Sequence, residues 1–147
     1  MNKYIFTQPT DLLPYCAHEL QDLSLARVQL ALYFLWAFYT TEHNKQELFP
    51  ASFQAYQYGA GLKAITQAYK DYSIEDYFKT KVIKKPAGQN ASVILDFIQA
   101  ILAQVDDMTD EELIKRAQQD RAWKQVYQTG AQNTMSKALV KQQYQSA

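Results

Sequence analysis

The sequence predicts a mostly α-helical fold, a single-domain helical bundle of about six to seven helices packed around a central hydrophobic helix at residues 25–42. Four glycines and four prolines among 147 residues are few for an all-β protein, which needs many tight turns. A chain of this length favours one domain over two. Hydrophobic residues make up 48% of it, enough to fill a core without disulfides or metals. We therefore expect one domain over residues 1–147, with flexible ends at residues 1–9 and 142–147.

The first expected helix begins near Thr10 or Asp11, either of which can cap it, and it ends at about Gln21. Pro14 is tolerated only in the first turn of this helix, because the N–H that it lacks would have no helical partner there. Apolar residues recur at helical spacing along one side of the segment, at Leu12, Leu13, Cys16 and Leu20. The helix is therefore predicted to pack one face on the core.

The second expected helix follows Ser24, which can cap it, and runs from Leu25 to about Glu42. One of its faces carries Leu25, Val28, Leu32, Leu35, Trp36 and Tyr39. Apolar residues also fill much of the rest, at Leu30, Tyr33, Phe34, Ala37 and Phe38. A helix that is apolar nearly all round sits in the centre of a domain and needs neighbours on several sides, which predicts the bundle.

The middle of the chain has a less regular pattern. Polar turn residues at 43–45 end the second helix. Residues 52–58 alternate only weakly between apolar and polar, so a short strand and an extended loop both stay open. Gly59 and Gly61 interrupt the chain before residues 62–72, whose apolar side chains return to helical spacing.

The last third of the chain is again expected to be helical. Helical spacing predicts further helices at residues 91–104, 110–118 and 122–128, and a last one that Ser136 caps. Thr109 and Glu112 have the spacing of a capping box, which opens the second of these helices. Residues 79–90 and 129–133 are expected to be connections.

Charge and hydropathy exclude several function classes. The chain carries 15 basic and 15 acidic side chains, which argues against a generic nucleic-acid or anionic-membrane binder. The most apolar run, residues 28–39, is shorter than the roughly 20 residues that a membrane span needs, so we expect no membrane insertion. A single cysteine and an N-terminus without a long apolar core favour a cytoplasmic protein.

No recognisable catalytic or metal-binding pattern occurs in the sequence. His18 and His43 form no HxxxH or HxxE pair and join no cysteine cluster, which argues against a zinc or iron site. Cys16 and His18 would point in different directions from one helix, so Cys16 is predicted to be a buried small hydrophobic residue. Carboxylates at 106–107 and 110–112 are explained by the positive end of a helix dipole. We therefore expect no enzyme activity, no catalytic residues, no metal and no cofactor.

Two groups of residues are candidates for contact with a partner. One is a lysine cluster in the expected loop, formed by Lys79, Lys81, Lys84 and Lys85. It is either a solvated loop or an electrostatic handle for an acidic partner or a phosphate backbone. The other is a group of tyrosines on either side of the glycines, at Tyr56, Tyr58, Tyr69, Tyr72 and Tyr77. Each of these serves either core packing or an interface, where tyrosine is enriched.

Four segments, in order along about residues 10–145, resemble the Panacea domain. Residues 23–34, LSLARVQLALYF, are similar to the "KLQKLLYFAQ" helix of that family, and residues 48–59, LFPASFQAYQYG, to its "LF…F.AW.YGPV" stretch. Residues 120–124, DRAWK, are similar to its "DPW" helix start, and residues 133–141, NTMSKALVK, to its closing segment.

The chain departs from the Panacea pattern at three places. The Pro-Val after the tyrosine–glycine pair is replaced by Ala60 and Gly61, which makes that turn more flexible. Ala122 stands in place of the "DPW" proline, and Ala26-Arg27 in place of the lysine that opens the helix motif.

The resemblance implies a mostly helical protein whose relatives include antitoxins of bacterial and phage toxin–antitoxin pairs. Some relatives are linked to delivery of the bound toxin to a protease, and many lie on mobile elements. It therefore favours an antitoxin-like protein that neutralises a partner protein, its cognate toxin, by direct binding. The alternative is a phage or mobile-element inhibitor of a host defence system such as an RNA-guided nuclease (anti-CRISPR-like).

In both interpretations the partner is a protein, nucleic acid is not expected as the primary target, and a homodimer stays open. The residues expected to contact the partner are Tyr56, Tyr58, Gly59, Tyr72, Tyr77, Lys81, Lys84 and Lys85.

Overall fold

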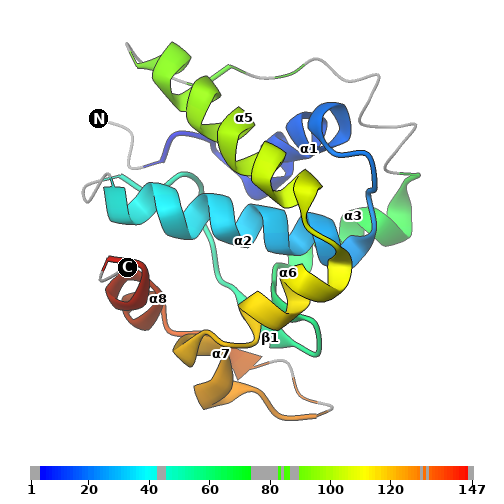
Figure 1. Cartoon of the computed structure of the whole chain (residues 1–147), viewed down its shortest axis with the longest axis vertical. Coiled ribbons are helices and arrows are strands. Elements are labelled where there is room, and N and C mark those ends of the chain that lie inside the picture. Colours follow the sequence, from blue (N-terminus) through cyan, green and yellow to red (C-terminus); the bar gives the residue numbers. More distant parts are fainter. Residues whose placement is uncertain are drawn as a thin grey trace.

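Helices dominate the structure, which confirms the predicted mostly α-helical fold class (Figure 1). The computed structural model describes residues 4–42, 46–73, 83, 85–86, 90–129, 131 and 133–145. Within these residues the helices are η1 (Pro9–Leu12, a 3-10 helix), α1 (Leu13–Glu19), α2 (Leu25–Glu42), α3 (Lys63–Asp71), α5 (Ala91–Asp107), α6 (Asp110–Ala117), α7 (Arg121–Val126) and α8 (Lys137–Gln145). The strands are β1 (Gln54–Tyr56), β2 (Gly59–Gly61) and β3 (Asn133–Thr134).

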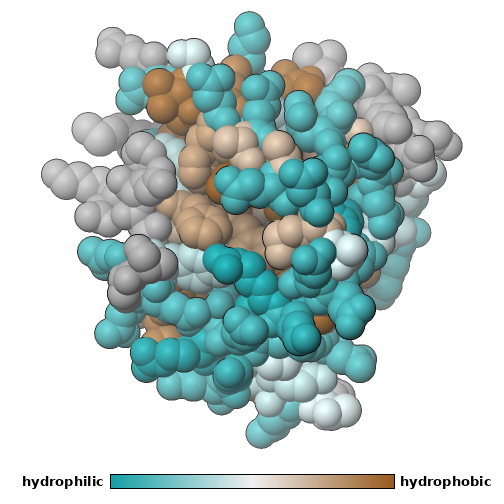
Figure 2. Space-filling view, viewed as in Figure 1, coloured by the Kyte–Doolittle hydropathy of each residue, from teal (hydrophilic) through white to brown (hydrophobic). Residues whose placement is uncertain are grey.

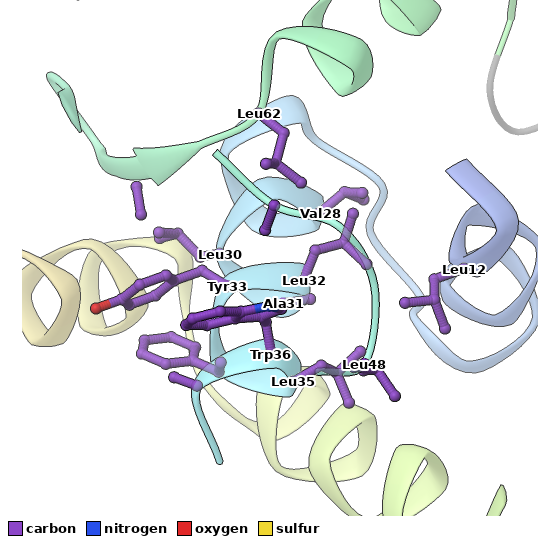
Figure 3. Close-up of a cluster of buried hydrophobic side chains, with 14 of the residues drawn as sticks. Leu12, Val28, Leu30, Ala31, Leu32, Tyr33, Leu35, Trp36, Leu48 and Leu62 are labelled. Atoms are coloured by element: carbon purple, nitrogen blue, oxygen red, sulfur yellow. The ribbon is translucent and has the colours of Figure 1, made fainter. Parts of the chain in front are cut away.

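The central helix lies where the sequence predicts it, at residues 25–42. It contacts α1, α3, α5, α6, α8 and β2, so neighbours surround it on several sides. Figure 3 shows side chains such as Leu32, Tyr33 and Trp36 projecting from this helix in different directions, and all three are fully buried. Each large apolar side chain buried in this way stabilises the fold by about 1.5–3 kcal/mol. The all-round apolar pattern therefore marks the centre of the bundle.

A small antiparallel sheet packs against the central helix. The strand order is β2-β1-β3, with Tyr56 paired to Gly59 at the turn of the β1–β2 hairpin and Gln54 paired to Thr134. Of the two alternatives for residues 52–58, the short strand is correct over part of the segment. The expectation that residues 129–133 form only a connection is wrong at Asn133, which begins β3. The two residues of β3 form a strand because they pair with the edge of β1 that lies opposite β2.

The first helix differs from its prediction at both ends. Residues 9–12 form a 3-10 turn, and the α-helix covers only Leu13–Glu19. Neither Thr10 nor Asp11 is the cap: Gln8 precedes the 3-10 turn and Leu12 precedes α1, while the Asp11 carboxylate accepts a hydrogen bond from the Thr7 hydroxyl at 3.1 Å. Pro14 lies in the first turn, as its chemistry requires.

The predicted capping box is present at the start of α6. The Thr109 hydroxyl accepts from the main-chain N–H of Glu112 at 3.1 Å, and the Glu112 carboxylate accepts from the N–H of Thr109 at 2.9 Å. These two bonds satisfy N–H groups that would otherwise lack partners at a helix start. The turn between α5 and α6 is therefore locally encoded.

Both ends of the described chain contribute side chains to the core. Ile5 and Phe6 are buried, and their main-chain N–H groups donate to the carbonyl oxygens of Glu47 and Leu48 at 3.2 and 2.8 Å. At the other end, Tyr144 is buried in α8. Ile5, Phe6 and Tyr144 therefore pack on the core, and the flexibility expected of the chain ends stays a prediction.

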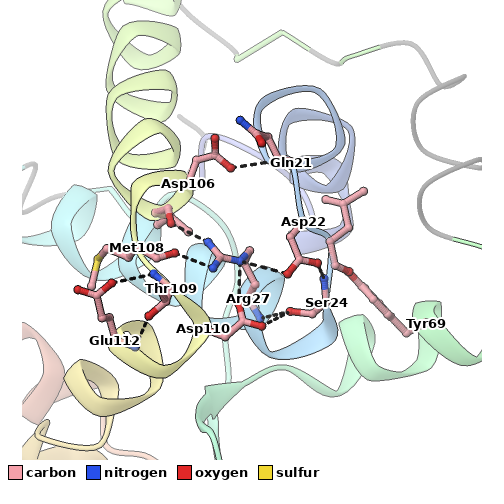
Figure 4. Close-up of polar contacts among 12 residues, drawn as sticks. Gln21, Asp22, Ser24, Arg27, Tyr69, Asp106, Met108, Thr109, Asp110 and Glu112 are labelled. Carbon is pink, nitrogen blue, oxygen red and sulfur yellow. Dashed lines mark hydrogen bonds and ion pairs between the residues drawn. The ribbon is translucent and has the colours of Figure 1, made fainter.

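Arg27 ties the start of α2 to the turn between α5 and α6 (Figure 4). Its Nε donates to the Asp110 carboxylate at 2.8 Å, and its two other nitrogens donate to the carbonyl oxygens of Val105 and Met108 at 2.7 and 2.6 Å. Only 6% of the Arg27 side chain is exposed, and a charge so deeply buried needs such partners. One side chain therefore fixes three segments of the bundle.

Candidate partner-binding site

Four aromatic side chains gather where the β1–β2 hairpin meets α7, and we call this group the aromatic surface. Tyr56 and Tyr58 stack with ring centres 5.4 Å apart, and Trp123 and Tyr127 stack at 4.5 Å. The indole Nε1 of Trp123 donates to the main-chain carbonyl oxygen of Tyr56 at 2.8 Å, which joins the two pairs. All four side chains are partly buried and keep part of their surface exposed.

The hairpin that carries Tyr56 and Tyr58 is held tightly against α6 and α2. Gly59 has a φ of +132°, and a Cβ added there would lie 2.8 Å from the Cβ of Ala117 and 3.0 Å from Cδ2 of Leu30. Only glycine fits so strained and crowded a position. In addition, Gln118 Nε2 donates to the carbonyl oxygen of Gln57 at 2.8 Å. The turn of the hairpin is therefore clamped to the end of α6.

The start of α7 is positioned by a buried carboxylate, Asp120. Its oxygens accept hydrogen bonds from the hydroxyls of Tyr33 and Tyr144 and from Gln143 Nε2, the last two at 2.7 Å. Burial, together with the nearby Asp120 charge, raises the pKa of both tyrosines above their ordinary value. Asp120 thus links α2, α7 and α8, and it places Trp123 one turn further along.

The structure brings together three of the residues expected to contact a partner, namely Tyr56, Tyr58 and Gly59. Gly59 shapes the hairpin, and the hydroxyl of Tyr58 is buried, where burial raises its pKa. Tyr72 is 47% exposed but follows α3, away from the hairpin (Figure 1).

The lysine cluster is described only at one position. Lys85 is exposed in the connection between α3 and α5. Tyr77, Lys79, Lys81 and Lys84 lie outside the described residues. Neither Lys85 nor Tyr72 therefore belongs to the aromatic surface.

Sequence reasoning missed Trp123 and Tyr127 as members of the site. The sequence predicts a helix at residues 122–128 that contains both of them, and it gives neither a place in the site. Their spacing of four residues places them on one helix face, which is a usable signal. The pairing of that face with the Tyr56 carbonyl links residues 67 positions apart and has no signature in the sequence.

A second surface feature is an apolar hollow of about 240 Å³ between α2, α5 and α6. It is lined by Phe34, Phe38, Ile101, Gln104, Val105, Met108, Leu113 and Arg116. Figure 2 shows the apolar atoms gathered around a depression in the middle of this face, with polar side chains around them. The central helix is therefore not covered completely, and part of its Phe34–Phe38 side faces an opening.

The described part of the chain also contains one thiol, a histidine and several carboxylates. Cys16 is buried as predicted, and burial raises the pKa of its thiol to about 12. In those residues, no three or more His, Cys, Asp or Glu side chains are grouped so that they could hold a metal ion. None of the described helices combines the length and the hydropathy that a membrane crossing requires.

Comparisons of the chain with protein-family models, with curated proteins and with solved structures give no match.

Proposed function

We propose that this protein is antitoxin-like and neutralises a partner protein by binding it directly through the aromatic surface. The observation that carries the proposal is the bond between Trp123 Nε1 and the Tyr56 carbonyl oxygen, which joins two stacked aromatic pairs. Tryptophan and tyrosine are the residues most enriched among those that dominate binding energy at interfaces. A group of four such rings, partly buried and partly open, therefore has the composition of an interface centre.

Rigidity supports this use of the aromatic surface. Gly59 is packed against Ala117 and Leu30, and Asp120 is held by three hydrogen bonds, so both segments that carry the rings are fixed. A surface that is ordered before binding loses less conformational entropy when the partner arrives. A typical interface covers about 800 Å² per partner. That is about a tenth of the 8164 Å² of accessible surface on this chain.

The resemblance to the Panacea domain adds to the proposal. Residues 48–59 contribute the hairpin with Tyr56 and Tyr58, and residues 120–124 contribute Asp120 and Trp123. Tyr33, in the helix motif, donates to Asp120. Three of the four similar segments thus contribute to the aromatic surface or to its support, which supports the proposal.

Co-expression with neighbouring genes tests the proposal. Each gene adjacent to this one in the source genome is induced in a bacterial host, with and without this protein, and growth is measured. We expect one neighbour to be toxic alone and harmless together with this protein. The Tyr127→Ser variant should lose the rescue, whereas Tyr72→Ser, which removes an exposed tyrosine from another region, should keep it.

Two results would contradict the proposal. In one, no neighbour is toxic, or toxicity persists although the protein accumulates in folded form. In the other, Tyr127→Ser and Tyr72→Ser rescue growth equally, which would show that the aromatic surface does not bind the toxin. Rescue of phage propagation from an RNA-guided nuclease would instead select the alternative, a host-defence inhibitor. That alternative uses the lysine cluster, of which only Lys85 is among the described residues, so the structure adds no specific support to it.

A further inference from the structure

The apolar hollow carries a cation on its rim, and this cation is Arg116. Its guanidinium carbon lies 5.6 Å from the ring centre of Phe34 and 5.9 Å from that of Phe38. The side chain is exposed, and within the described residues no carboxylate lies within 4.0 Å of its nitrogens. Glu112, one helical turn earlier, is held by the main-chain N–H of Thr109. Arg116 is therefore oriented by aromatic rings and available to an anion.

Arg116 also borders a polar pocket of about 220 Å³ on its other side, together with Gln119, Asp120, Gln143 and Tyr144. The two carboxylate oxygens of Asp120 already accept hydrogen bonds within the fold, so they are engaged there. Gln104 and Gln119 are exposed at the hollow and at the polar pocket. A polar region thus adjoins the apolar hollow, with the guanidinium between them.

We infer that the hollow binds a polypeptide segment that presents one large apolar side chain beside a carboxylate. The apolar side chain enters the hollow, and the carboxylate pairs with Arg116. An engineered protein cavity of about 150 Å³ holds benzene, so 240 Å³ accommodates one phenylalanine or leucine side chain. The guanidinium suits a carboxylate, which it can bind through two parallel hydrogen bonds.

A polypeptide fits better than a small apolar acid because of the polar groups on both sides. Gln104 and Gln119 offer amides that can bond to the main chain of an extended segment as it leaves the hollow. A small apolar acid has no main chain, so the Gln104 and Gln119 amides would stay hydrogen-bonded to water when it binds. This second site is distinct from the aromatic surface, so the inference goes beyond the proposed function and does not depend on it.

Three matched peptides with blocked ends test the inference, ADFDA, ANFNA and ADADA. Each is titrated into the full-length protein with isotope-labelled methyl groups, and NMR shifts of Ile101, Met108 and Leu113 are followed. We expect ADFDA to shift these methyl groups and to bind about two- to five-fold more tightly than ANFNA, the range for an exposed ion pair. ADADA, which lacks the apolar side chain, should produce no shift at these positions.

Two variants of α6 test whether the preference for ADFDA depends on the charge of Arg116. Arg116→Gln should make ADFDA and ANFNA bind equally, while both still bind. Lys115→Gln removes the same charge from the adjacent residue, outside the hollow, and should leave the preference for ADFDA intact. The methyl spectrum of each unliganded variant shows whether it is folded.

The inference is overturned if the wild-type protein binds ADFDA and ANFNA equally, if ADADA binds as well as ADFDA, or if the shifts fall outside the hollow. Loss of the preference in Lys115→Gln would also overturn it, because net charge would then be the cause. Growth rescue in the co-expression test is a separate readout. It can succeed while the peptides fail to bind, or fail while they bind.

Discussion

The indole of Trp123 donates its N–H to the main-chain carbonyl oxygen of Tyr56 at 2.8 Å, across 67 residues of sequence. This bond connects α7, where Trp123 stacks on Tyr127, to the main chain of the β1–β2 hairpin, where Tyr56 stacks on Tyr58. Without it, the hairpin and α7 would keep their separate anchors, at Gly59 and Asp120, but the rings would lose their fixed relation. The bond therefore contributes both to the fold and to the proposed binding role.

Replacing Trp123 with phenylalanine should destabilise the protein by about 1–2 kcal/mol, because the Tyr56 carbonyl oxygen loses its donor while the aromatic ring is kept. Equilibrium unfolding in urea measures the change. Tyr127→Phe is the matched control, since it removes a polar atom from the other ring of the same stack. Equal losses in the two variants would show that the indole hydrogen bond contributes nothing specific.

Arg27 should be far less replaceable than its acidic partner. Arg27→Lys keeps the charge but cannot reach Asp110 and the carbonyl oxygens of Val105 and Met108 together, and we expect a loss of about 2–4 kcal/mol. Asp110→Asn should cost under about 1 kcal/mol, because the Asp110 side chain is 43% exposed and water can replace it. Thermal and urea unfolding of both variants compare the two costs. A larger loss for Asp110→Asn would contradict the assignment.

Gly59→Ala should lower stability by more than about 2 kcal/mol, since the new Cβ meets the strained φ of +132° as well as Ala117 and Leu30. Gly61→Ala should cost less, because Gly61 does not have a positive φ and its new Cβ, 2.6 Å from Cδ2 of Tyr56, meets a partly exposed ring and not the core. Urea midpoints of the two variants give the comparison. A larger loss of stability in Gly61→Ala than in Gly59→Ala would show that the packing of Gly59 against α6 does not hold the hairpin.

From pH 7 to about pH 9 the buried groups of Cys16, Tyr33 and Tyr144 leave stability unchanged, and above about pH 9 stability should fall as the pH rises. Burial raises the pKa of Cys16 from 9.0 to about 12, and it raises the pKa values of Tyr33 and Tyr144 above the ordinary tyrosine value. The folded state therefore keeps protons that the unfolded chain releases above these ordinary values. Each such group lowers the free energy of unfolding by about 1.4 kcal/mol per pH unit.

Urea midpoints between pH 7 and 10.5 measure this decline. In Cys16→Ala the part that begins near pH 9 should disappear, and the tyrosine part above pH 10 should remain. A midpoint that stays constant to pH 10.5, or a decline unchanged in Cys16→Ala, would contradict the assigned causes.

The central helix could be predicted from the sequence because its signal is local and redundant. Apolar residues lie on every side of residues 25–42, and no surface helix has that pattern. The capping box of Thr109 and Glu112 is likewise encoded within four residues. The signal for each of these elements lies within its own segment, and both elements agree with the structure to within a residue or two.

The sheet could be predicted only in part. Gly59 and Gly61 have no side chain and Ala60 has only a methyl group, so β2 cannot show the alternation of a strand. Their strand conformation depends on contacts with Ala117 and Leu30, which lie far away in sequence. The two residues of β3 are too few for any pattern, and they become a strand only through pairing with β1.

The candidate sites were partly visible in the sequence. Tyr56 and Tyr58 stood out because tyrosine is concentrated there, but their partner Trp123 is brought to them by the Asp120 network. Arg116 belongs to a charged helix that has the composition of a solvated face. Its place over Phe34 and Phe38 follows from the crossing of α6 over α2, which no local pattern encodes.

The most direct test of the proposed function is the dissociation constant between this purified protein and the purified product of its toxic neighbour, measured by calorimetry. We predict that Tyr127→Ser weakens binding by about thirty-fold, corresponding to the loss of about 2 kcal/mol at a residue that dominates an interface. Tyr72→Ser should stay within about two-fold of the wild type. Equal affinities for the two variants, or no binding by the wild-type protein, would contradict the account.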